Sequence, residues 1–145
     1  HSIRRRQRQM CIRDRSNDPS LSEDYYDVSG VLQANSGNRL AYVPELSYVL
    51  GLDKVLSIFG MPGYVSVDYS YTGDRYTSQA NDLKLPSYAI ANMRVGVESG
   101  NRSMEVFISN LTDENGYQSR YDDFGDIRRT QNRPKVIGLR FKYRY

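Results

Sequence analysis

The chain has 145 residues, with 20 Lys and Arg against 17 Asp and Glu, and a formal net charge of +3. The positive excess does not indicate a nucleic-acid-binding body, because residues 1–15 hold six arginines and one acid, whereas the remainder has 14 basic and 16 acidic side chains. His1 and Cys11, the only residues of their types, also lie in that segment, so the rest offers no thiol for a disulfide and no imidazole for a metal or a proton relay.

The N-terminal segment contains the run RRRQRQMCIRDR at residues 4–15, which resembles translated sequencing-adapter sequence. A basic arm that binds nucleic acid or a membrane surface is the alternative. On either interpretation we expect residues 1–21 to be a non-native or disordered arm and residues 22–145 to hold the fold. We find no signal peptide and no run of about 18 apolar residues that would indicate a transmembrane helix.

The next segments have the composition of loops, with one short strand possible at residues 25–35. From residue 45 onward, apolar and polar side chains alternate with the period of a strand whose two faces meet different environments. Residues 53–62 are ambiguous between a strand extension and one helical turn. The strands predicted from this alternation are residues 45–52, 63–73, 87–98, 103–111 and 133–145.

The predicted connections alternate between short and long. A tight turn is expected at residues 99–102, whereas residues 74–84 and 112–132 form long polar loops. Bacterial outer-membrane barrels have this asymmetry, with short periplasmic turns and longer external loops. We therefore predict an all-β fold, an antiparallel meander of about five transmembrane β-strands.

The last strand has one face without charge, formed by Ile137, Leu139, Phe141, Tyr143 and Tyr145. A charged side chain costs about 2–4 kcal/mol at the lipid midplane of a barrel, so this face suits lipid, although a soluble edge strand can alternate in the same way. Five strands cannot stand alone in lipid, because the sheet edges would leave backbone groups unpaired. The membrane interpretation therefore requires a larger closed barrel.

The sequence contains no constellation that indicates an enzyme. No Ser-His, Cys-His or His-based metal set can form outside residues 1–15, and the Asp122-Asp123-x-x-Asp126 cluster lacks the spacing of a 12-residue calcium loop. We expect no catalytic residue, no metal and no cofactor.

Four stretches resemble the C-terminal end of TonB-dependent outer-membrane receptors. They are DYSYTGDRY (68–76), LPSYAIANMRVGVESG (85–100), MEVFISNLTDENGY (104–117) and RPKVIGLRFKYRY (133–145), with GNRLAYVPELSY (37–48) before them. The ordered series is more specific than any one motif. The resemblance implies a 22-stranded barrel with a plugged lumen in the outer membrane, of which residues 22–145 supply about the last five strands.

The resemblance also implies what the parent protein does. It would take up a scarce nutrient, such as a ferric siderophore, haem, cobalamin or a glycan, with energy transmitted by TonB. The implied partners are the rest of the barrel and its plug domain, TonB, the barrel assembly machinery, and outer-membrane lipid and lipopolysaccharide. The plug and the TonB-contacting segment are expected outside this chain, and its residues do not identify the small-molecule ligand.

Two sets of candidate site residues follow. The family's assembly signal, Gly-x-x-aromatic-x-aromatic, is matched by Gly138, Phe141 and Tyr143, with Tyr145 terminal, although Val136 stands where a polar residue is usual. The residues proposed for ligand contact in the last external loop are Tyr117, Arg120, Tyr121, Asp122, Arg128 and Arg129. The simpler interpretations are lipid-facing wall for the first set and a solvated loop for the second.

Two other functions compete with the receptor. A soluble antiparallel β-sandwich could bind glycans or proteins through tyrosine-rich loops. A passive porin or adhesin barrel would share the architecture without needing TonB.

Overall fold

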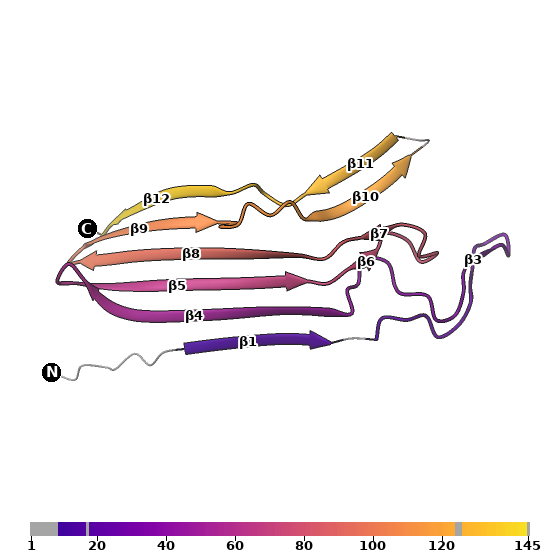
Figure 1. The fold of residues 1–145 in the computed structure, drawn as a ribbon, viewed down its shortest axis with the longest axis horizontal. Coiled ribbons are helices and arrows are strands. Elements are labelled where there is room, and N and C mark those ends of the chain that lie inside the picture. Colours follow the sequence, from indigo (N-terminus) through magenta and orange to yellow (C-terminus); the bar gives the residue numbers. More distant parts are fainter. Residues whose placement is uncertain (1–8, 17, 124–125, 145) are drawn as a thin grey trace.

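The computed structural model describes residues 9–16, 18–123 and 126–144. Its largest element is a six-stranded antiparallel sheet with the strand order β1-β4-β5-β8-β9-β12 (Figure 1). These strands are β1 (Gln9–Ser16), β4 (Leu46–Ile58), β5 (Met61–Thr72), β8 (Tyr88–Ser99), β9 (Arg102–Ser109) and β12 (Val136–Tyr143). Among the described residues the structure has no helix long and apolar enough to cross a bilayer.

The five strands predicted from alternation are confirmed as β4, β5, β8, β9 and β12. The ambiguous residues 53–62 complete β4 and begin β5, with a turn at Phe59 and Gly60 between them. Phe59 and Gly60 both have positive φ, which is the backbone of a type I′ hairpin. A phenylalanine rarely adopts that conformation, so local residue preferences did not indicate the turn.

The predicted tight turn at residues 99–102 is also confirmed. Ser99 pairs with Arg102, and Gly100 has a φ of 55° at the first central position, where a type II′ hairpin requires glycine. Both short turns lie at the same end of the sheet as the C-terminus (Figure 1). We call this end the turn end and the opposite end the loop end.

The structure differs from the expected arm at residues 9–16. These residues form β1, which pairs antiparallel with β4 along its whole length, from Gln9 opposite Asp53 to Ser16 opposite Leu46. The physical reason is the open edge of β4, whose unpaired N–H and C=O groups accept any extended partner. A second contact lies within the expected arm, a bridge between Ser20 and Arg39.

At the loop end the described part of the chain forms three short hairpins. They pair β2 (Tyr25–Tyr26) with β3 (Leu32–Ala34), β6 (Arg75–Tyr76) with β7 (Lys84–Leu85), and β10 (Tyr117–Asp123) with β11 (Asp126–Gln131). The loops expected at 74–84 and 112–132 thus contain paired strands. We call residues 18–45, 73–87 and 110–135 the outer segments.

The register separates the two faces of the sheet cleanly. One row that crosses five strands is wholly apolar, consisting of Leu52, Val67, Met93, Ile108 and Ile137. The next row, one residue along each strand, consists of Asp53, Ser66, Arg94, Phe107 and Gly138. Because successive side chains point to opposite sides, the sheet has an apolar face and a polar face.

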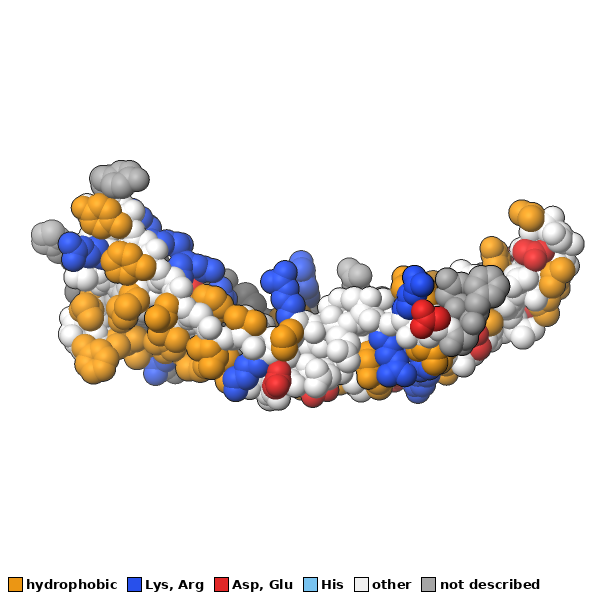
Figure 2. Space-filling view, turned by 90° about the horizontal axis from the view of Figure 1, so that it is seen from above, with side chains coloured by type: hydrophobic (Ala, Val, Ile, Leu, Met, Phe, Trp, Pro, Cys, Tyr) orange, Lys and Arg blue, Asp and Glu red, His pale blue; other side chains and the backbone are white. Residues whose placement is uncertain are grey.

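Nothing in the described residues covers the apolar face. Leu139 is 74% exposed and Phe141 is 67% exposed, whereas among the described residues the only buried hydrophobic ones are Ala34 and Leu85, both in the outer segments. Figure 2 shows hydrophobic side chains gathered at the turn end of this bowed sheet. A β-sandwich would bury such a face against a second sheet, so the sandwich alternative does not describe this fold.

Candidate ligand, wall and assembly sites

The polar face of the sheet carries a network at its centre. Asn92 on β8 donates to Asp68 on β5 through Nδ2 at 2.6 Å. Arg94 donates to the Ser66 hydroxyl at 3.2 Å and lies 3.9 Å from the Asp68 carboxylate. The charges on this face are therefore matched across neighbouring strands, as expected for cross-strand pairs.

A second cluster lies nearer the turn end and joins three strands. Glu105 on β9 accepts from Arg140 on β12 at 2.7 Å and from the Tyr64 hydroxyl on β5. The Arg140 guanidinium also lies 5.6 Å from the centre of the Phe107 ring. A hollow of about 340 Å³ extends along this face between Asp68 and Arg140.

Two glycines on the polar face lie directly beneath aromatic rings. A Cβ on Gly96 would lie 2.5 Å from the Tyr64 ring, and a Cβ on Gly138 would lie 2.4 Å from the Phe107 ring. In both cases the aromatic residue is the cross-strand partner of the glycine. The ring thus covers backbone that would otherwise be bare, which is the aromatic rescue of a strand glycine.

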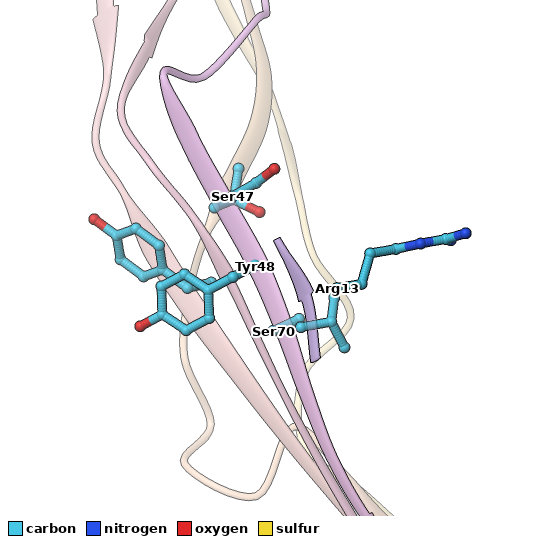
Figure 3. A pocket seen from close by; sticks show the side chains of 7 residues that line it. Arg13, Ser47, Tyr48 and Ser70 are labelled. Atoms are coloured by element: carbon cyan, nitrogen blue, oxygen red, sulfur yellow. The ribbon is translucent and has the colours of Figure 1, made fainter. Parts of the chain in front are cut away.

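Another hollow, of about 460 Å³, lies near the loop end of β1, β4 and β5. It does not form an enclosed site, because Figure 3 places the Tyr48 ring and Arg13 on opposite sides of the β4 ribbon. Tyr48 instead stacks on Tyr71 across the apolar face, with ring centres 5.1 Å apart.

The outer segments are joined to one another by charged side chains. Arg39 donates to the Asp74 carboxylate at 2.9 Å and to the Asp74 carbonyl at 2.6 Å. Lys84 approaches the same carboxylate at 3.0 Å, and Arg39 Nε lies 3.2 Å from Glu45 without hydrogen-bond alignment. Asn81 closes the cluster by accepting from the Arg39 amide at 2.8 Å.

This cluster shifts the titration of its members. The hydrogen bonds from Arg39 and then Lys84 to the ionised carboxylate lower the pKa of Asp74 from its ordinary value. The same pairing raises the pKa of Lys84. Both groups are partly open to water, so the contribution of each pair to stability is small.

Asn110 ties the start of the last outer segment to its end. This residue is 3% exposed, accepts from the Glu114 amide at 2.9 Å, and donates to the carbonyls of Glu114 and Arg133 at 2.9 and 3.0 Å. Asn132 donates to the Glu114 carbonyl at 2.8 Å and accepts from the Gly116 amide at 2.6 Å. The NLTD stretch therefore begins with an asparagine that fixes the base of the β10–β11 hairpin.

Two arginines, one beneath this hairpin and one on β10 itself, have nitrogens without a hydrogen-bond partner among the described residues. Arg75 is 5% exposed and donates to the carbonyls of Tyr117 and Gln118 through NH2, while its NH1 is unpaired. The Nε of Arg120 is likewise buried and unpaired. Tyr42 lies close by, with its hydroxyl 3.4 Å from the Arg120 carbonyl, and burial raises the pKa of this tyrosine.

The predicted ligand contacts come together on the β10–β11 hairpin but divide between its two faces. Arg120 pairs with Arg129, and Tyr121 pairs with Arg128, so these two pairs point in opposite directions. Arg129 lies 5.5 Å from the centre of the Tyr117 ring, whereas the Asp122 side chain lies outside the described residues. Sequence reasoning missed Arg75 and Tyr42, whose role depends on contacts between distant segments.

The predicted assembly residues lie on both faces of β12. Phe141 and Tyr143 point from the apolar face, and Tyr143 lies beside Arg102. Gly138 lies on the polar face under Phe107, so it has a packing role of its own, and Tyr145 lies outside the described residues. No group of three or more His, Cys, Asp or Glu among the described residues could hold a metal ion.

Comparison with known proteins gives two findings. Residues 18–111 match the family described as TonB dependent receptor-like, beta-barrel. The fold is similar to the crystal structure of the ferric yersiniabactin uptake receptor FyuA from Yersinia pestis, with a TM-score of 0.70 and 18% sequence identity over 74% of this chain. The chain spans 17% of the length of that receptor, and at this identity the likeness concerns the fold.

Proposed function

Since the chain belongs to the TonB-dependent receptor β-barrel family, we propose that it forms part of an active transporter for a scarce nutrient. The chain is a barrel fragment of the bacterial outer membrane, and its family is one of receptors rather than enzymes. In this proposal residues 22–145 supply wall, external hairpins and the assembly strand of a 22-stranded barrel. TonB and a plug domain, both outside the chain, couple its ligand to the proton-motive force.

The observation that carries the proposal is the division of one sheet into a charge-matched face and an apolar face. The polar face, with Asp68, Arg94 and Glu105, suits an enclosed lumen that holds water or a plug domain. The apolar face suits lipid, since no described residue covers it. A passive porin would share these faces, but the family match favours the TonB-coupled receptor.

The ligand would meet the outer segments first. The β10–β11 hairpin offers exposed Arg128 and Tyr121. Arg120 on the same hairpin and Arg75 beneath it have buried guanidinium nitrogens without a hydrogen-bond partner among the described residues. Guanidinium groups bind carboxylate and other anionic oxygens through paired hydrogen bonds. These guanidinium groups favour a nutrient that is anionic and rich in oxygen atoms, of which a ferric siderophore is one class.

Uptake by the intact receptor tests this function. Cells that carry the receptor would be supplied with ferric siderophores, haem, cobalamin and glycans, with TonB present or deleted. We expect accumulation of one class only, and only with TonB. Arg120→Ala together with Arg128→Ala should weaken binding of that ligand about tenfold or more, whereas Arg102→Ala at the turn end should leave it unchanged. Uptake that persists without TonB would contradict the proposal.

The assembly role of β12 is a separate proposal. The edge of β12 that does not face β9 is open in the described structure, so a strand of the assembly machinery can add to it by β-augmentation. The assembly machinery would then contact Phe141 and Tyr143 on the apolar side of the pair formed by β12 and the added strand. A cross-link from position 143 to the assembly machinery during biogenesis would support this role, and its absence would leave these residues as lipid-facing wall.

A further inference from the structure

Lys54 interrupts the apolar face. It lies between Leu52 and Leu56 on β4 and pairs with Val65 on β5, so its side chain leaves the sheet on the apolar side. The row then continues through Val95, Val106 and Leu139. Apart from Arg102, in the row next to a turn, Lys54 is the only charged side chain on this face of β4, β5, β8, β9 and β12.

The position is unfavourable unless the ammonium group meets an anion. Asp53, the adjacent acid, points to the opposite face, and no acidic group in the described part of the chain lies within ion-pair distance of Lys54. An unpaired cation in the hydrocarbon layer is costly, and charged residues at such positions find a partner or reach the interface. We propose that Lys54 binds the phosphate of a phospholipid in the periplasmic leaflet, an inference that rests on the proposed membrane function.

The depth of Lys54 in the membrane indicates which leaflet supplies the phosphate. Tyr71 and Met61 are ten residues apart on β5, which corresponds to about 25 Å of membrane thickness for a strand tilted by about 40°. Val65, the partner of Lys54, is four residues from Met61 and six from Tyr71. Lys54 therefore lies about 10 Å from the inner edge of the apolar band and about 15 Å from the outer edge.

The geometry of the lysine side chain also favours the periplasmic leaflet. The four-carbon stem of lysine can lie along apolar surface while the ammonium group extends toward the nearer interface. The nearer interface is at the turn end, which is periplasmic in barrels of this asymmetry. Lipopolysaccharide phosphates lie at the far interface, beyond the stacked rings of Tyr48 and Tyr71. Phospholipid phosphate is therefore the nearer anion, and contact from this depth requires the headgroup to be drawn inward by local thinning of the bilayer.

The direct test measures the distance between nitrogen and phosphorus. The intact receptor, with ¹⁵N at lysine Nζ, would be reconstituted in phosphatidylglycerol and phosphatidylethanolamine vesicles in phosphate-free buffer. Lys54→Arg keeps the charge and removes one Nζ signal, which identifies Lys54 by difference. Lys142→Arg, on the polar face of β12, identifies the matched control signal. We expect ³¹P to attenuate the Lys54 signal in solid-state NMR and to leave the Lys142 signal unattenuated.

A second measurement separates this inference from the membrane assignment. Transfer of magnetisation from lipid acyl protons to Leu52 and Val65 reports whether the apolar face meets hydrocarbon. Acyl transfer without ³¹P attenuation at Lys54 would overturn the phosphate site and leave the wall intact. Absence of acyl transfer would overturn the wall, and the phosphate site with it.

Discussion

The sheet and the outer segments are stabilised in opposite ways. The sheet has long, regular ladders and exposes large apolar side chains such as Leu139 and Phe141, whereas the outer segments have short ladders and hold the buried hydrophobic residues Ala34 and Leu85. Most side-chain hydrogen bonds to backbone also lie in the outer segments, as at Asn110. The sheet thus depends on the medium around it, and the outer segments depend on their own polar contacts.

This contrast predicts that the same substitution has different effects on the two faces of one strand. Val106→Arg places a charge in the apolar face of β9 and should cost about 2–4 kcal/mol. Ser103→Arg places the same side chain on the polar face, near Glu98, and should be nearly neutral. The amount of heat-modifiable folded receptor in the outer membrane measures the effect of each substitution. Equal loss from the two variants would contradict the assignment of faces.

The outer segments should instead be destabilised by the loss of a polar contact. Asn110→Ala removes the partner of the Glu114 amide and one of the two donors to each of the Glu114 and Arg133 carbonyls, and we expect a loss of about 2–3 kcal/mol. Hydrogen exchange of the amides at residues 111–116 should accelerate, while exchange in β5 remains slow. Asn101→Ala in an exposed turn is the control and should change stability by less than about 0.5 kcal/mol. Unchanged exchange at Glu114 would show that Asn110 does not hold the hairpin.

Two glycine substitutions separate packing from assembly on the polar face. Gly96→Ala and Gly138→Ala both force a Cβ into an aromatic ring, and each should cost about 1–3 kcal/mol in folded stability. Only Gly138 belongs to the proposed assembly signal. If that signal operates, Gly138→Ala should reduce the rate of insertion into the outer membrane more than Gly96→Ala does. Equal insertion rates would assign Gly138 a packing role alone.

The smallest effect concerns pH at the loop end. The pKa of Asp74 is lowered in the folded protein, so its stabilising contribution is present above its ordinary value and is lost as pH falls below about 4. We expect less than about 1 kcal/mol, because the carboxylate is partly exposed. Protease cleavage of residues 36–46 should increase at low pH in the wild type. This increase should be larger than the increase seen in the Asp74→Asn variant. The same acid response in both proteins would exclude Asp74 as the cause.

Much of the sheet was predictable because each strand alternates between two environments. Val65, Val67, Tyr69 and Tyr71 appear at every second position. Apart from Lys54 opposite Val65, their partners across β4 and β8 are apolar as well. The turn at Ser99–Arg102 was predictable because glycine occupies the position that needs positive φ. The Phe59–Gly60 turn was not, since it places an aromatic residue in a conformation that disfavours it.

The outer segments were less predictable because their contacts join residues far apart in sequence. Arg39 meets Asp74, and Arg75 meets the carbonyls of Tyr117 and Gln118, without any local periodicity to indicate it. The pairing of β1 with β4 was missed for a related reason, because an open edge accepts a partner whose own pattern is weak. Lys54 is plain in the sequence, but only the register with Val65 shows which face it leaves.

A nitroxide scan along β5 tests most directly whether lipid wets one face and an enclosed aqueous space meets the other. Single cysteines at residues 64–71 of the intact receptor would be spin-labelled in vesicles, and collisions with oxygen and with a nickel chelate recorded. We predict a period of two, with oxygen favoured at Val65, Val67, Tyr69 and Tyr71 and the chelate favoured at the residues between them. Odd-numbered positions shielded from both reagents would show that this face is packed inside protein, and would contradict the account.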